Sequence, residues 1–108
     1  MKENLSSNEV KEVSDQELID ALRDRGPEHP LTKELLRDWC IQEEGKVEHG
    51  SFEERVHFEL KRARLYLAAG YGEESYECYQ DAFTIAENAG LDVLCQEINN
   101  EVAMIEAQ

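Results

Sequence analysis

Lysine and arginine are missing from the last part of this chain. Residues 65–108 hold nine acidic residues and no base, whereas residues 1–64 hold all 11 bases beside 16 acids. The formal net charge of the 108 residues is −14. Direct binding to nucleic acid or to anionic membranes relies on Lys and Arg. The charge therefore argues against both of these partners, and the acidic segment is first of all expected to form a solvated face.

Long apolar runs and paired cysteine motifs are missing as well. No run reaches the ~18 apolar residues of a transmembrane helix, and the opening MKENLSSNEVKEV has no apolar core of a signal peptide. The three cysteines, Cys40, Cys78 and Cys95, are odd in number and form no CxxC pair. Each falls on an apolar helical stripe, which favours reduced, buried thiols. These absences together predict a cytoplasmic protein.

The sequence also lacks the motifs of common enzymes. It contains no HExxH, no GxSxG and no glycine-rich phosphate loop. The histidines His29, His49 and His57 show no ligand spacing among themselves, although His49 and His57 with Glu48 or Glu53 are conceivable metal ligands. We therefore expect a non-catalytic protein with no cofactor and no metal site. An enzyme remains the minor hypothesis.

What the chain does contain is a succession of amphipathic helical segments. Both prolines, Pro27 and Pro30, fall in one linker, and no segment of alternating β-branched residues competes with helix. Short connections between amphipathic helices favour antiparallel neighbours. The sequence thus predicts an all-α fold, a small bundle of about five antiparallel helices. The expected helices cover residues 15–25, 32–44, 52–69, 73–88 and 91–107.

Capping residues set the expected helix ends. Ser14 with Glu17, and Ser51 with Glu54, form capping-box patterns. Thr32 is the expected N-cap of the second helix, because it follows Pro30. Residues 1–13 are expected to be a flexible N-terminal tail, and residues 14–108 a single helical domain.

Residues 56–89 resemble a single tetratricopeptide repeat. The likeness lies in small residues where two helices approach closely, in large residues that fill the gaps, and in a glycine at the turn: Ala63, Ser75 and Ala82; Tyr66 and Tyr79; Gly70. Glu59 and Arg62 depart from the pattern, since the family usually has large apolar side chains there. No second copy is visible, and segment 91–107 resembles a capping helix. Three-helix modules of the microtubule-interacting-and-trafficking type are similar in this region.

The resemblance implies a scaffold for protein binding whose first helix lines the binding surface. The corresponding face of segment 52–69 carries His57, Lys61 and Arg64 on successive turns. In relatives of the carboxylate-clamp type, such positions hold an acidic peptide end. The simpler interpretation is that Lys61 and Arg64 form the exposed flank of an amphipathic helix. Tyr71, at the turn, is a further candidate contact because tyrosines often anchor interfaces.

Two functions follow as expectations. The first is a non-catalytic protein–protein interaction or adaptor module that binds another protein or peptide. The alternative is an acidic inhibitor, or a decoy that mimics nucleic acid and occupies a basic surface of another protein. Pairing with a second copy of the chain, as a homodimer, is also compatible with the apolar stripe of segment 91–107.

Overall fold

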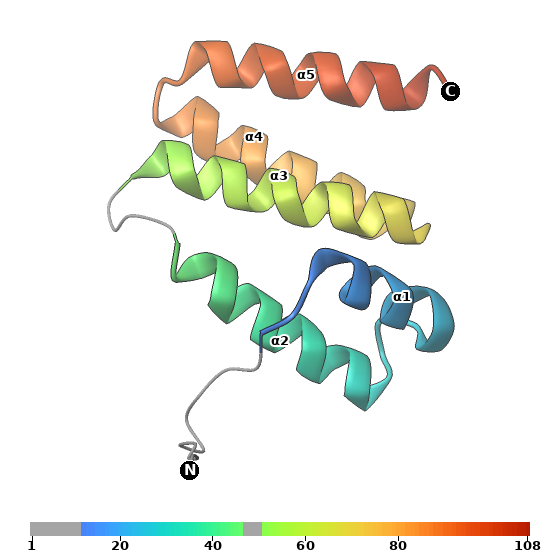
Figure 1. Cartoon of the computed structure of the whole chain (residues 1–108). Coiled ribbons are helices and arrows are strands. Elements are labelled where there is room, and N and C mark those ends of the chain that lie inside the picture. The colour runs from blue at the N-terminus through green and yellow to red at the C-terminus, as the bar shows by residue number, and fades with distance from the viewer. Residues whose placement is uncertain (1–11, 47–50) are drawn as a thin grey trace. The chain divides into compact units, whose positions relative to one another are not determined.

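The fold is all-α, as the sequence predicts. The computed structural model describes residues 12–46 and 51–108, and these contain five helices and no strand (Figure 1). The helices are α1 (Asp15–Arg25), α2 (Pro30–Glu44), α3 (Phe52–Ala69), α4 (Gly72–Asn88) and α5 (Asp92–Glu106). Their contacts divide the chain into two compact units, residues 1–46 and 47–108. The prediction of a single domain from residue 14 to residue 108 stays a prediction.

Helices α1 and α2 form a hairpin in the first unit. Ser14 caps α1 as predicted, since its side chain accepts a hydrogen bond from the Glu17 N–H at 3.1 Å. The predicted N-cap of α2 is wrong. His29 caps this helix, with Nδ1 accepting from the Leu31 N–H, and Pro30 occupies the first helical turn. Thr32 lies inside the helix, fully buried, and donates its hydroxyl to the Ala21 carbonyl of α1 at 3.4 Å.

Val13, which the sequence places in a flexible tail, packs instead against α2. Val13 is buried, and its backbone pairs with the side-chain amide of Gln42 in α2. The Val13 N–H donates to Oε1 at 2.8 Å, and Nε2 donates to the Val13 carbonyl at 3.0 Å. Trp39 of α2 adds an indole hydrogen bond to Asp15 at 2.8 Å. Residue 13 therefore belongs to the hairpin, while residues 1–11 lie outside the described residues.

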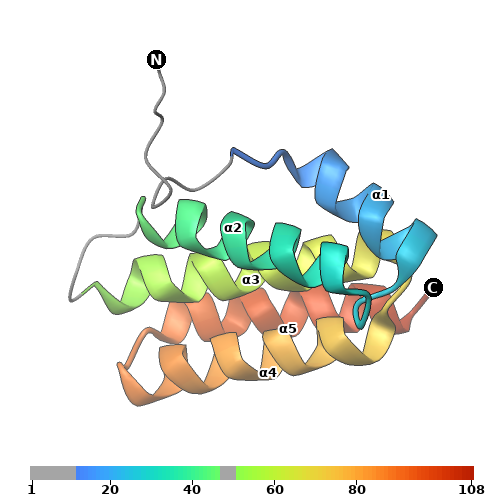
Figure 2. The same ribbon diagram turned by 90° about the horizontal axis from the view of Figure 1, so that it is seen from below.

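In the second unit, α4 packs against both α3 and α5, and consecutive helices run antiparallel (Figures 1 and 2). Ser51 caps α3 by accepting from the Glu54 N–H at 3.2 Å, as predicted. Gly70 ends α3 in the left-handed conformation, with φ at 92°, which costs glycine no Cβ strain. The short turn that follows brings α4 back along α3.

Small side chains let α3 and α4 approach closely. Ala63 and Ala82 are fully buried, and the Ser75 hydroxyl donates to the Ala63 carbonyl across the interface at 2.7 Å. Tyr66 and Tyr79 are buried large residues of the same hairpin. The sequence predicts an apolar stripe along α3 made of Phe52, Val56, Leu60, Ala63 and Leu67. It is buried only in its middle, because its end residues Phe52 and Leu67 are exposed.

The apolar stripe of α5 is only partly covered. Leu94 and Ile98 are buried, whereas Val102 and Ile105 are half-buried.

The three cysteines differ in burial. All three thiols are free, Cys78 is buried, and Cys40 and Cys95 are half-buried. The prediction of a buried thiol is thus confirmed for Cys78 alone.

Candidate functional site

Three of the four residues that the sequence singled out share one helix. His57, Lys61 and Arg64 lie on successive turns of α3, and all three are exposed. Tyr71 is half-buried at the N-cap position of α4, where its side chain makes no capping hydrogen bond. Its backbone N–H donates to the Tyr66 carbonyl at 2.9 Å. Because Tyr71 follows the end of α3 and His57 lies near its start, most of the helix separates them.

Arg64 is bound by a carboxylate of the same chain. Its Nε donates to Oε2 of Glu101 at 2.9 Å, and its Nη2 donates to Oε1 at 2.8 Å. The Tyr79 hydroxyl also donates to Oε2 of Glu101. The two-pronged geometry suits the planar guanidinium and is the strongest form of an Arg–carboxylate pair. One carboxylate on α5 thereby connects α5 to α3 and to α4.

The cluster of Arg64, Tyr79 and Glu101 has one stable charge state at neutral pH. The hydrogen bond from Arg64 lowers the pKa of Glu101, and the same bond raises the pKa of Arg64 further. Burial, followed by the hydrogen bond to Glu101, raises the pKa of the Tyr79 phenol well above its ordinary value. The cluster therefore holds a carboxylate, a guanidinium and a neutral phenol.

The pairing of Arg64 with Glu101 affects the predicted binding of an acidic peptide by His57, Lys61 and Arg64. A partner's carboxylate that bound Arg64 would compete with Glu101 for the same donors, at the high effective concentration of a group on the same chain. The assignment of His57, Lys61 and Arg64 to an acidic peptide stays a prediction. The structure adds the requirement that Glu101 be displaced or shared.

A second feature is a hollow beside His57. It encloses about 580 Å³ between the first turns of α3 and the turn that begins α5. Glu53 and His57 line it from α3, and residues 90–94 with Glu97 line the other side. Within residues 12–46 and 51–108, no cluster of His, Cys, Asp or Glu is arranged to hold a metal ion. The conceivable ligands Glu48 and His49 lie outside the described residues.

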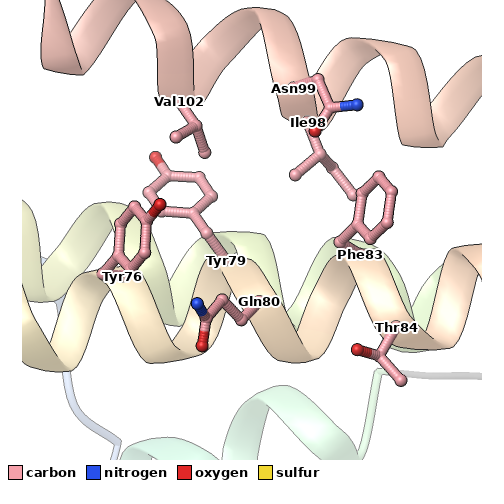
Figure 3. A pocket seen from close by; sticks show the side chains of 8 residues that line it. All are labelled: Tyr76, Tyr79, Gln80, Phe83, Thr84, Ile98, Asn99 and Val102. Atoms are coloured by element: carbon pink, nitrogen blue, oxygen red, sulfur yellow. The ribbon is translucent and has the colours of Figure 1, made fainter.

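The third feature is an apolar groove between α4 and α5, which encloses about 340 Å³ (Figure 3). Tyr79 and Phe83 extend from α4 toward α5, where Ile98 and Val102 face them. Tyr79 and Ile98 are 3% and 2% exposed and form the floor. The remaining lining residues are Tyr76, Gln80, Thr84 and Asn99. We call this feature the α4–α5 groove.

The apolar pattern of the sequence marks five of the eight residues that line the groove, but not the groove itself. Tyr76, Tyr79 and Phe83 stand out as one stripe of α4, and Ile98 and Val102 as one stripe of α5. A stripe predicts which face is apolar. It does not predict how far the facing stripe of the next helix covers it, because coverage depends on the packing of the two helices.

Comparison with models of protein families, with curated proteins and with solved structures found no match. None of the helices in the described parts of the chain is long and apolar enough to cross a membrane.

Proposed function

We propose that residues 51–108 form a non-catalytic protein–protein interaction module, an adaptor unit that binds another protein or peptide. The observation that carries the proposal is the α4–α5 groove. Its walls leave large apolar side chains in contact with water: Tyr76 is 46% exposed, and Phe83 and Val102 are half-buried. Concave apolar surfaces with polar edges are typical of binding sites.

The hairpin of α3 and α4 supports a scaffold of the tetratricopeptide-repeat type within this proposal. Its small residues are buried, and its interhelical contacts include the Ser75–Ala63 hydrogen bond. The two departures from the family pattern compensate each other, since Arg62 pairs with Glu59 at 3.0 Å. The guanidinium of Arg62 also lies 6.0 Å from the Phe58 ring centre. An ion pair thus occupies the positions where the family usually has apolar side chains.

The second candidate function, an acidic inhibitor or nucleic-acid-mimicking decoy, is favoured by the exposure of the acids. Seven of the nine carboxylates in residues 65–108 are exposed. A basic protein surface is the partner that such a face attracts, and the attraction would weaken as salt screens it. For either function we propose a cytoplasmic location, which suits the three free thiols.

The test of the module is capture of partner proteins from a native lysate by the immobilised chain, at about 50 mM and about 500 mM salt. The bait is compared with Asn99→Trp, which fills the groove from an exposed position, and with Asn100→Trp, one residue further on α5 and outside the groove. The module predicts bands that are lost with Asn99→Trp and kept with Asn100→Trp, whether or not high salt weakens them. Bands that vanish at high salt and ignore both substitutions would favour the decoy.

A further inference from the structure

The length of the α4–α5 groove sets the size of its occupant. The lining residues of α4 run from Tyr76 to Thr84, which corresponds to about 12 Å at 1.5 Å per residue. Two turns of a partner helix have this length. An amphipathic helix of this kind presents side chains at positions i, i+3 or i+4, and i+7 to one groove.

Acidic residues lie within one turn of the lining residues on both helices, and we call them the acidic edge. On α4, Glu77 lies three residues before Gln80, and Asp81 lies three residues before Thr84, so each acid neighbours a lining residue on the helix surface. On α5, Glu106 lies one turn beyond Val102, and the Tyr76 hydroxyl donates to it at 3.4 Å. Glu87 follows Thr84 by three residues at the other end.

No basic side chain from this part of the sequence offsets these acids. Residues 65–108 contain no Lys or Arg, so the helices that build the groove contribute only negative charge to it. The one carboxylate here that pairs with Arg64, Glu101, points to the cluster with α3 and Tyr79. The acidic edge therefore selects a partner by its charge, while the apolar floor provides the contact area.

From these observations we infer that the α4–α5 groove binds the apolar face of a basic amphipathic helix of a partner protein. The inference rests on the proposed function and specifies the partner's chemistry. Three aliphatic side chains fill the groove, and flanking lysines or arginines meet Glu77, Asp81 and Glu106. A second copy of the chain is the wrong occupant, because it would bring two acidic edges together. Nucleic acid and anionic lipid are repelled by the same charge.

The experiment uses the full chain and a fluorescent 16-residue helical peptide of lysines with leucines at i, i+3, i+4 and i+7 spacing. Two further peptides replace every lysine by glutamine or by glutamate. Fluorescence anisotropy at about 150 mM salt measures the dissociation constants. We expect the lysine peptide to bind at least tenfold more tightly than the glutamine peptide, and the glutamate peptide not to bind.

The protein controls separate groove binding from attraction to an acidic protein in general. Asn99→Arg and Asn100→Arg each add one positive charge at adjacent exposed positions of α5, but only Asn99 lines the groove. We expect Asn99→Arg to weaken lysine-peptide binding at least tenfold and Asn100→Arg to change it less than twofold. Circular dichroism checks that both variants keep the helical fold.

Equal losses in the two variants would overturn the inference, because they would show binding by net charge alone. Failure of the lysine peptide to bind, or equal binding of the glutamate peptide, would overturn it as well. Proteins captured from the lysate and lost with Asn99→Trp would, in either case, still support the interaction module. The inference and the proposed function thus fail on different readouts.

Discussion

Glu101 of α5 forms hydrogen bonds with both other helices of the second unit. It accepts two hydrogen bonds from Arg64 of α3 and one from Tyr79 of α4. Its side chain is 31% exposed and that of Arg64 is 53% exposed, so water weakens the attraction. The two-pronged geometry and the buried phenol partner favour a measurable contribution despite this exposure.

Replacing Glu101 by glutamine should therefore destabilise the chain by about 1 kcal/mol at pH 7. Glutamine keeps the size of the side chain but removes the negative charge that Arg64 needs. Urea unfolding followed by circular dichroism measures the change. Glu97→Gln is the matched control, one turn earlier on α5 and exposed, and it should shift stability by less than about 0.5 kcal/mol. Equal shifts in both variants would contradict the assignment.

The same contribution should depend on pH in one direction. The pKa of Glu101 in the folded chain lies below its ordinary value of 4.5. The stabilisation is hence fully present above pH 4.5 and is lost as the pH falls through the lowered pKa. The stability difference between the parent chain and Glu101→Gln should shrink toward zero on acidification over this window. A difference that stays constant well below pH 4.5 would mean that charge is not its source.

Cys78 should be the slowest of the three thiols to react. Burial raises its pKa to about 11, so about one molecule in a thousand carries the reactive thiolate at pH 8. Cys40 and Cys95 are half-buried and more accessible. With Ellman's reagent we expect two thiols to react in the native chain and the third only after denaturant is added. Cys78→Ala should leave the native reaction unchanged and abolish the denaturant-dependent one.

At the scale of elements, α3 and α4 make the most extensive helix contact among the described residues, and Ala63 lies within it. Ala63 is fully buried and its carbonyl accepts from Ser75. Ala63→Leu should cost about 1–3 kcal/mol, because the added carbons force apart two helices that meet through small residues. Ala68→Leu, at an exposed position of the same helix, is the control and should change stability by less than about 0.5 kcal/mol. Chemical denaturation measures the stability change of each variant. Equal losses of stability in the two variants would refute close packing at Ala63.

Element boundaries were predictable wherever a local signal sets them. The caps Ser14 and Ser51 and the glycine turn at Gly70 act within a few residues, so the sequence predicts the helices they bound almost to the residue. The start of α2 was mispredicted because two polar residues compete there. His29 precedes Pro30 and caps from outside the helix, and Thr32 is used instead for a contact with α1.

Contacts between distant residues carried no local signal. Val13 and Gln42 are 29 residues apart and Arg64 and Glu101 are 37 apart, and neither pair follows from spacing or periodicity. The basic residues of α3 could be identified from sequence, but the carboxylate bound to Arg64 could not. The α4–α5 groove is a similar case, since each wall is a visible stripe and only packing decides what remains open.

At the scale of the whole molecule, the second unit carries the larger part of the net charge, −9 of the total −14, from 13 acids and four bases in residues 47–108. That unit holds the base-free segment 65–108, the α4–α5 groove and the cluster around Glu101. The base-free segment, the groove and the cluster around Glu101 thus lie within the same three helices. The proposed function accordingly requires residues 51–108 and assigns no partner contact to the hairpin of α1 and α2.

Because these contacts lie within the second unit, we expect residues 51–108 to fold without the rest of the chain. The Ser75–Ala63 and Arg64–Glu101 contacts and the floor of the groove are internal to that fragment. We expect it to be helical and to unfold cooperatively by circular dichroism. Residues 12–46 should be largely unfolded alone, since chains below about 40 residues rarely bury enough surface. A disordered fragment 51–108 would contradict this assignment. One shared transition in the full chain, at a temperature above that of the fragment, would instead support the single domain expected for residues 14–108.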